Sequence, residues 1–225
     1  MQTGAERRAR LRALVELLDE VYGRPVLEPR YEPLDELIFT VLSQNTADVN
    51  TERTFAALKE RFPRWDLVRD ADVADIEQTI ALGGLAHTKA PRIKRILQEL
   101  SPPGAPPELG DLSALTDTEA QRLLMRLSGV GPKTAACVLL FSLGRPVMPV
   151  DTHVHRVARR LGLIAATVTA EQAHPELTAL AGPDPRDVYA AHVGFVRHGR
   201  RVCHARRPCC TECVLAPLCP SAGLA

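Results

Sequence analysis

Apolar residues recur at helical spacing along nearly the whole chain. Between Leu11 and Val21 they fall at steps of three and four residues, and the segments after Pro33 and Pro132 show the same spacing. No segment has the alternation of apolar and polar residues that is typical of a half-buried strand. The sequence therefore predicts an all-α fold.

Two local signals divide this helical pattern. Ser101–Gly110 contains four prolines and two glycines, which predicts a stiff connecting loop because proline disrupts a helix interior. Thr116 is followed three residues later by Glu119, the capping-box pattern that marks the start of a helix. With 225 residues, the chain is long enough for one or two domains.

The composition excludes several classes of protein. No apolar run approaches the ~20 residues that a membrane span needs. The N-terminus lacks the apolar core of a signal peptide, and acidic residues near it argue against a transit peptide. We therefore expect a cytoplasmic protein with no membrane partner. Thiols stay reduced in that compartment, so the six cysteines are not expected to form a disulfide framework.

The distribution of charge is more informative than the net charge, which is only +1. No acidic residue lies between Asp187 and Glu212. The basic residues of this stretch are Arg197, Arg200, Arg201, Arg206 and Arg207, with His192, His198 and His204. Such a stretch suits a phosphate backbone, and Arg200 is a candidate DNA contact. A solvated basic face without a ligand is an equally good interpretation of this stretch alone.

A tight turn joins two predicted helices in the segment LSGVGPKTAACVLLF, Leu127–Phe141. Gly129 and Gly131 flank Val130 and can take positive φ, which would expose backbone amides where the next helix begins at Pro132. Amides at a helix N-terminus bind anions, so a DNA phosphate is a natural ligand. The alternative is a tight corner that uses glycine for purely steric reasons.

Two charged residues that follow this turn in the sequence are candidates for catalysis. Lys133 lies in the first turn of the helix, where the dipole disfavours a protonated amine, and a lysine with a lowered pKa suits Schiff-base formation. Its alternative role is to contact the phosphate as a point charge. Asp151 precedes another predicted helix, and a fixed carboxylate stabilises positive charge that develops on a sugar. Its alternative role, an N-cap beside Thr152, is compatible with the first.

Four cysteines near the C-terminus have the spacing C-x6-C-x2-C-x5-C: Cys203, Cys210, Cys213 and Cys219. Four thiolates within such a short stretch of a reduced protein predict a shared metal centre. On ligand chemistry alone, four cysteines are compatible with either an iron–sulfur centre or zinc. Replacing Cys210 by its neighbour Cys209 gives a second possible ligand set, with the spacing C-x5-C-x3-C-x5-C.

The segment GVGPKTA, with VDTHVHRV placing Asp151 eighteen positions after Lys133, resembles the helix–hairpin–helix DNA glycosylases, specifically the endonuclease III branch. The resemblance implies that Lys133 attacks C1′ of a damaged nucleotide with assistance from Asp151. Relatives that only remove a base lack this lysine. It further implies removal of oxidised pyrimidines, strand cleavage by β-elimination, and a [4Fe–4S] cluster on Cys203, Cys210, Cys213 and Cys219. This cluster would have a structural role and would face the DNA.

A base inside a duplex must be flipped out before such an enzyme can act on it. The resemblance implies that two loops do this, LSQNTAD at Leu42–Asp48 and GGLAHTKA at Gly83–Ala90. Leu85 resembles the wedge that separates bases, although an ordinary buried leucine is the alternative. Gln44 or Asn45 would fill the gap left by the flipped base.

Four further residues complete the candidate DNA contacts. His87, Thr88 and Lys89 follow the wedge, and either the Lys89 amine or the Thr88 backbone is expected to hold a phosphate. His153 in the VDTH motif is expected near the pocket, with a structural histidine as an equal alternative.

The resemblance implies two helical domains: a barrel of about six helices at 31–149, and a cluster domain formed by 1–30 and 150–225. Damaged double-stranded DNA would lie in the cleft between them, and we expect the protein to act as a monomer. Two rival functions remain at this point. One is a monofunctional glycosylase in which Lys133 only binds DNA, and the other is a non-catalytic iron–sulfur protein that binds damaged DNA.

Overall fold

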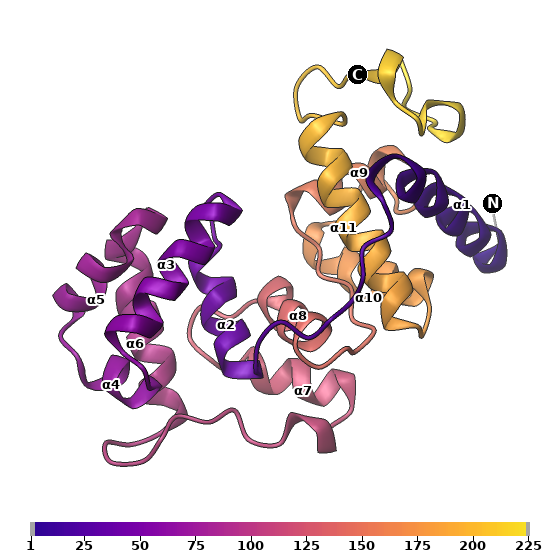
Figure 1. The fold of residues 1–225 in the computed structure, drawn as a ribbon. Helices are drawn as coiled ribbons and strands as arrows, with labels where there is room; N and C mark the ends of the chain where they lie inside the picture. The colour runs from indigo at the N-terminus through magenta and orange to yellow at the C-terminus, as the bar shows by residue number, and fades with distance from the viewer. Residues whose placement is uncertain (1–2, 224–225) are drawn as a thin grey trace. The chain divides into compact units, whose positions relative to one another are not determined.

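The computed structural model describes residues 3–223, and every regular element among them is helical (Figure 1). The prediction of an all-α fold is confirmed. The chain divides into two compact units, one formed by residues up to Pro29 and from Leu139 onward, the other by Arg30–Val138. The second change of unit therefore falls inside helix α8, Pro132–Phe141, whereas the family resemblance implies a domain boundary at residue 149. None of the helices in the described range is both long enough and apolar enough to span a bilayer.

The Arg30–Val138 unit is built around helix α6, Ala86–Leu100. This helix packs against α2, α4 and α5, and α3 packs against α2 and α5. Their apolar faces form a core that is closed to solvent, because residues at helical spacing such as Leu37, Ile76 and Ile93 are completely buried. The other elements of the unit, besides the start of α8, are α2 Pro33–Leu42, α3 Asp48–Arg61, α4 Trp65–Asp70, α5 Val73–Ile80, η1 Ala81–Gly83, η2 Leu112–Ala114 and α7 Asp117–Leu124.

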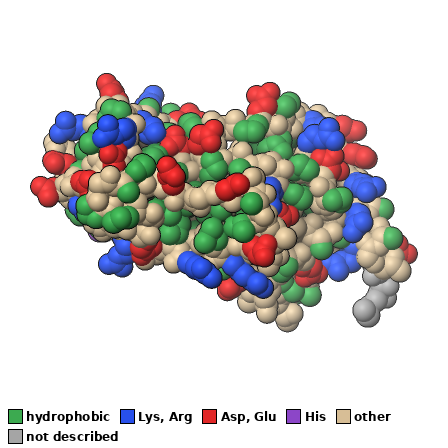
Figure 2. All heavy atoms as spheres, turned by 90° about the horizontal axis from the view of Figure 1, so that it is seen from below, with side chains coloured by type: hydrophobic (Ala, Val, Ile, Leu, Met, Phe, Trp, Pro, Cys, Tyr) green, Lys and Arg blue, Asp and Glu red, His purple; other side chains and the backbone are tan. Residues whose placement is uncertain are grey.

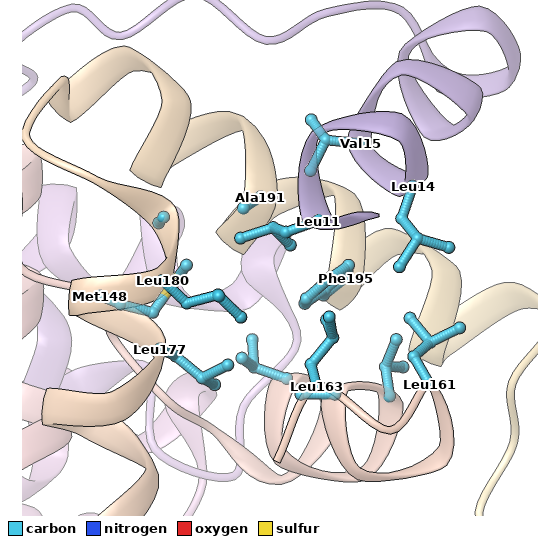
Figure 3. Packing of buried hydrophobic residues seen from close by; sticks show 14 of the residues in the cluster. Leu11, Leu14, Val15, Met148, Leu161, Leu163, Leu177, Leu180, Ala191 and Phe195 are labelled. Carbon is cyan, nitrogen blue, oxygen red and sulfur yellow. The ribbon is translucent and has the colours of Figure 1, made fainter. Parts of the chain in front are cut away.

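The second unit joins the two ends of the chain. Helix α1, Gly4–Tyr22, packs against α10, Ala170–Ala181, and α11, Pro185–Arg201, which in turn packs against α9, Thr152–Arg160. Leu14, Leu161 and Phe195 meet in the resulting core (Figure 3). Beyond α11 the chain contains two short 3-10 turns, η3 Cys210–Glu212 and η4 Ala216–Leu218.

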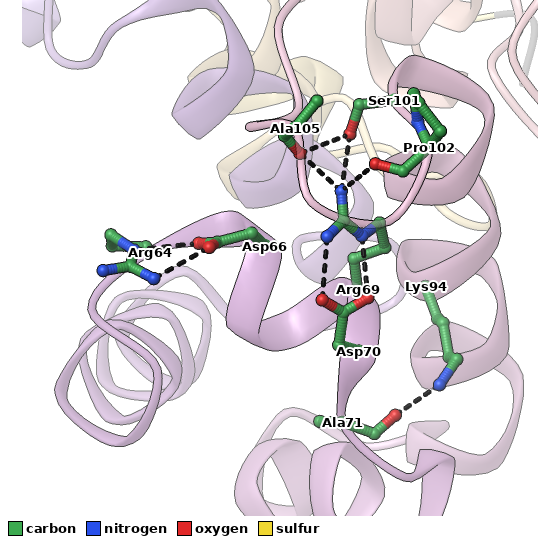
Figure 4. A network of polar contacts seen from close by, with 9 residues as sticks. All are labelled: Arg64, Asp66, Arg69, Asp70, Ala71, Lys94, Ser101, Pro102 and Ala105. Atoms are coloured by element: carbon green, nitrogen blue, oxygen red, sulfur yellow. Dashed lines mark hydrogen bonds and ion pairs between the residues drawn. The ribbon is translucent and has the colours of Figure 1, made fainter.

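The proline-rich segment Ser101–Gly110 is a loop, as predicted, and one buried side chain anchors its first half. The Arg69 guanidinium donates to the Ser101 hydroxyl at 2.8 Å and to the carbonyls of Pro102 and Ala105 at 2.7 and 2.5 Å (Figure 4). Its other nitrogens bind the Asp70 carboxylate. A segment that cannot form its own helical hydrogen bonds thus obtains donors from a neighbouring helix.

Candidate active site

The hairpin before α8 is closed by a glycine that no other residue can replace without strain. Gly129 has φ +76°, and a Cβ at this position would lie 2.7 Å from Nε of Arg92. Gly131 differs from the prediction, because it has no positive φ, and a Cβ there would meet no atom within 4 Å. Steric need therefore explains Gly129, whereas nothing in the fold requires glycine at 131.

Helix α6 supports this hairpin from one side. The Glu99 carboxylate accepts hydrogen bonds from the backbone N–H of Ser128, at 2.8 Å, and from the Ser128 hydroxyl. Within the turn, the Val130 N–H donates to the Leu127 carbonyl at 3.1 Å. Gly131 precedes the helix and its carbonyl accepts from Ala135 at 3.0 Å. The hairpin is consequently a fixed feature of its unit rather than a free loop.

Lys133 is half-buried in the first turn of α8, as the sequence predicts. A carboxylate that the sequence analysis missed lies within its electrostatic reach. Glu36 of α2 is completely buried and binds Arg30 at 2.9 Å and the Thr40 hydroxyl at 3.2 Å. Burial raises the pKa of Glu36, whereas Arg30, Thr40 and the positive charge of Lys133 lower it. An acid among the apolar positions of a helix is the signal that would have revealed it.

Asp151 belongs to the other unit and is the N-cap of α9. Its Oδ1 accepts the backbone N–H of Val154 at 2.7 Å, and its carbonyl accepts that of His155 at 2.9 Å. The capping interpretation is therefore confirmed for this residue. A carboxylate has about four acceptor positions, so a cap bond on one oxygen leaves capacity for a second partner.

The two loops that the sequence assigns to base flipping share an unusual backbone conformation. Asn45 has φ 54° and Leu85 has φ 53°, and both side chains are exposed. The alternative of a buried Leu85 is wrong, since 45% of the residue is accessible to solvent. Gln44 is half-buried, and its Oε1 accepts a hydrogen bond from Arg92 at 2.7 Å.

The expected phosphate contacts after the wedge need correction. Lys89 is only 2% exposed, and its ammonium donates to the Leu42 carbonyl, the Thr46 hydroxyl and the Gly83 carbonyl at 2.7, 2.6 and 3.0 Å. An ammonium has three donors, so none remains for a phosphate. The Thr88 N–H is also bound, to the Leu85 carbonyl at 3.0 Å. His87 is exposed and stays a candidate contact.

The predicted metal ligands Cys203, Cys210, Cys213 and Cys219 line one cavity, together with Cys209. Burial raises the pKa of the Cys213 thiol, a bond from the Leu215 backbone lowers it, and the three other predicted ligands raise it again. The three other thiols are therefore within electrostatic range of Cys213. In residues 3–223, however, no three His, Cys, Asp or Glu side chains converge on the position of a single metal ion.

Helix α9 connects this cavity to the VDTH motif through two arginines. Arg160 donates to Cys203 Sγ at 3.3 Å and to the His204 carbonyl at 2.6 Å. Arg156 donates to the Cys203 carbonyl at 3.0 Å and contacts His153 Nδ1 at 3.1 Å. His153 is half-buried, and its bond to Arg156 supports the structural alternative for this histidine.

The basic stretch at the end of α11 is only partly a surface. His192 and His198 are buried, and His192 binds the Pro149 carbonyl at 2.9 Å. Burial also lowers the pKa of His198 to about 4, so this side chain is neutral at physiological pH. The exposed members are Arg200, Arg201, Arg206 and Arg207. On the face shown in Figure 2, basic and acidic side chains are interspersed, in keeping with the small net charge.

A comparison with protein families decides the assignment. Residues 38–183, which include the hairpin, Lys133 and Asp151, match the model of the HhH-GPD superfamily base excision DNA repair proteins. The chain belongs to the HhH-GPD superfamily. The resemblance stated from the motifs is thereby confirmed.

HhH-GPD relatives with curated names extend the match over most of the chain. The endonuclease III of Thermotoga maritima is 35% identical over 209 residues, covering 91% of each chain. The endonuclease III of Synechocystis is 31% identical over 97% of this chain. A protein of Arabidopsis thaliana is 42% identical over 144 residues, but the match spans only 49% of that protein.

Solved structures give the same picture for the fold. A trapped endonuclease III–DNA covalent intermediate superposes with a TM-score of 0.76 at 25% identity, covering 99% of this chain and 98% of that one. A non-covalent endonuclease III–DNA complex superposes with a TM-score of 0.75 at 26% identity.

Proposed function

We propose that this HhH-GPD protein is a bifunctional DNA glycosylase and AP lyase that removes oxidised pyrimidines from duplex DNA. The observation that carries the proposal is Lys133, an amine in the first turn of the helix that follows the Gly129 hairpin. A monofunctional enzyme or a DNA-binding protein needs no nucleophile at this position. The similarity to endonuclease III over 91% of both chains supports the same reaction class.

The proposed chemistry begins with the neutral amine of Lys133. Its lone pair attacks C1′, the N-glycosidic bond breaks with its electrons passing to the base, and the departing base takes up a proton. The nitrogen loses one proton, and its lone pair then forms the C1′=N bond as the C1′–O4′ bond of the sugar ring breaks. O4′ takes up a proton, which leaves a protonated imine between Nζ and C1′. Loss of a C2′ proton then expels the 3′ phosphate by β-elimination, and hydrolysis of the imine frees the lysine.

Charges of the protein support these steps. Positive charge develops on the sugar as the glycosidic bond breaks, and the Asp151 carboxylate is proposed to stabilise it. The position of Asp151 as a helix cap holds the carboxylate in one orientation.

We assign the DNA contacts as follows. The hairpin residues Gly129, Val130 and Gly131 would hold a phosphate, and Leu85 would act as the wedge, which its exposure supports. Of the two candidate fillers, Asn45 is the better supported because it is exposed at the loop tip, whereas the Gln44 amide is bound to Arg92. Arg200 and His87 are exposed and remain candidate contacts.

We propose that Cys203, Cys210, Cys213 and Cys219 hold a [4Fe–4S] cluster. Two observations support this proposal: the four thiols line one cavity, and four cysteine thiolates are the ligand set of such a cluster. When bound, the cluster would cross-link the loop through its iron–sulfur bonds, and Arg160 would donate a hydrogen bond to one ligand sulfur.

Borohydride trapping on a duplex that contains thymine glycol tests the function. We expect a covalent protein–DNA adduct with the wild-type protein, no adduct with Lys133→Gln, and strongly reduced base release with Asp151→Asn. Base release without an adduct in the wild type would indicate a monofunctional glycosylase. Binding to abasic duplex with neither base release nor adduct would indicate a non-catalytic protein.

A further inference from the structure

Two exposed loop tips of the Arg30–Val138 unit are held in the left-handed backbone region without glycine. Asn45 and Leu85, the proposed filler and wedge, have φ of 54° and 53°. A leucine in this region is strained, and such conformations persist only where surrounding contacts over-determine them. The contacts that hold these tips therefore bear on how the protein probes a duplex.

One buried ammonium contacts both loops. Lys89 Nζ donates to the Leu42 carbonyl at the end of α2, to the Thr46 hydroxyl just after Asn45, and to the Gly83 carbonyl just before the wedge. The Thr46 hydroxyl itself donates to the Gly83 carbonyl at 2.5 Å. Lys89 and Thr46 thus form a cross-link between the two loops that does not involve either tip directly.

The cross-link is attached to a rigid support. Lys89 belongs to α6, whose core face is completely buried at Ala90, Ile93 and Ile96. One turn further along the same helix, Arg92 holds the side chain of Gln44. Three segments are therefore bound to this single helix: the wedge loop (residues 83–86), the filler loop (residues 43–46) and, through Glu99 and Ser128, the hairpin.

We propose that Lys89 is a positioning residue that couples the wedge loop to the filler loop, so that Leu85 and Asn45 enter the duplex as one unit. This proposal rests on the proposed function. The ammonium does not touch DNA, since all three of its donors are used within the protein. Its role is to keep the two tips at a constant separation, and misplacement of such groups by about 1 Å can reduce a rate about 100-fold.

Lys89→Met tests the proposal, because methionine has a similar length but cannot donate hydrogen bonds. We expect kcat/KM for excision of thymine glycol to fall about 10- to 100-fold. Cleavage of a preformed abasic site, which has no base to extrude, should fall by less than about threefold. A 2-aminopurine placed opposite the lesion should show less unstacking on binding of the variant, which a purely structural role would not produce.

Lys94→Met is the matched control. Lys94 lies on the same helix and also donates to a backbone carbonyl, that of Ala71, but it contacts neither loop (Figure 4). We expect this control to retain both activities. Equal losses of excision and abasic-site cleavage in Lys89→Met, or unchanged values of both, would overturn the proposal.

Hydrogen exchange in the absence of DNA separates this proposal from the proposed function. If Lys89 couples the loops, exchange in residues 43–46 and 83–86 should increase together in Lys89→Met and not in Lys94→Met. An increase in only one loop would refute the coupling, whatever the catalytic activity. Thr46→Val provides a second, milder variant should Lys89→Met fail to fold, and it should produce the same paired increase.

Discussion

Replacing the two hairpin glycines one at a time separates folding from DNA binding. In Gly129→Ala, an alanine must adopt the left-handed backbone conformation of this position, which costs about 1–2 kcal/mol. It would also lie 2.7 Å from Arg92 Nε, and overpacking of this kind costs about 1–3 kcal/mol. Because Arg92 is a flexible side chain and can move, we expect a total loss of roughly 2–4 kcal/mol.

Gly131→Ala is expected to behave differently. The φ of Gly131 is not positive, and no atom lies within 4 Å of the added methyl group. The only expected loss of stability arises because alanine is a weaker N-cap than glycine, and it is below about 1 kcal/mol. If the hairpin amides hold a phosphate, the methyl group should still obstruct it. Loss of one charge-assisted hydrogen bond, about 1.5–3 kcal/mol, would weaken binding to an abasic-site analogue by about tenfold or more.

Thermal unfolding and fluorescence anisotropy measure the two effects. For a chain of this size, 1 kcal/mol corresponds to about 2–4 °C, so Gly129→Ala should unfold roughly 5–15 °C below the wild type. Gly131→Ala should unfold within a few degrees of the wild type but bind the abasic analogue more weakly. Equal midpoints for the two variants would refute the steric explanation of Gly129. Unchanged binding by Gly131→Ala would refute the assignment of the phosphate site.

Two further predictions concern the cysteine cavity and the buried acid. Cys213→Ser should lose the visible absorbance of the purified protein and increase protease sensitivity after α11, whereas Cys209→Ser should do neither; retained absorbance in Cys213→Ser would contradict the ligand set. Glu36→Gln should change the pH dependence of stability. Burial raises the pKa of Glu36, so its contribution is fully present below the unfolded-state pKa and is lost as pH rises through the folded-state pKa. As pH rises above the ordinary glutamate pKa of about 4.3, the unfolding free energy of the wild type should therefore fall relative to that of Glu36→Gln, and parallel curves in chemical denaturation would count against this account.

Much of the fold could be predicted because its signals are local. Helical spacing of apolar residues led to the all-α class, and the Thr116–Glu119 capping box is present with both of its hydrogen bonds. The prolines of Ser101–Gly110 predicted a loop, although the sequence contained no sign that Arg69 would anchor it. The motifs around Lys133 and Asp151 indicated the family because hairpin and cap are formed by residues close together in the chain.

The roles of the polar residues in the loops required the tertiary structure. Lysine is rarely buried, and the sequence analysis offered either Lys89 or the Thr88 backbone as a phosphate contact. In the structure, residues 42, 46 and 83 supply three oxygens that satisfy the Lys89 ammonium inside the protein. The choice between Gln44 and Asn45 depends on Arg92, which lies nearly fifty residues away in the chain. Glu36 escaped notice because its burial depends on how α2 packs and because the nearby charge of Lys133 comes from a distant segment, although its partner Arg30 is only six residues away.

Local sequence patterns were thus sufficient for the helices, the hairpin turn and the caps at Thr116 and Asp151, since each depends on neighbours within a few residues. Burial of charge, loop strain and hydrogen-bond partners depend on which distant segments pack together. Removing a polar group from water costs free energy, and hydrogen bonds to partners inside the protein offset that cost. Only the packing of α6 against the loops therefore reveals that Lys89 is an internal cross-link and that Leu85 is exposed.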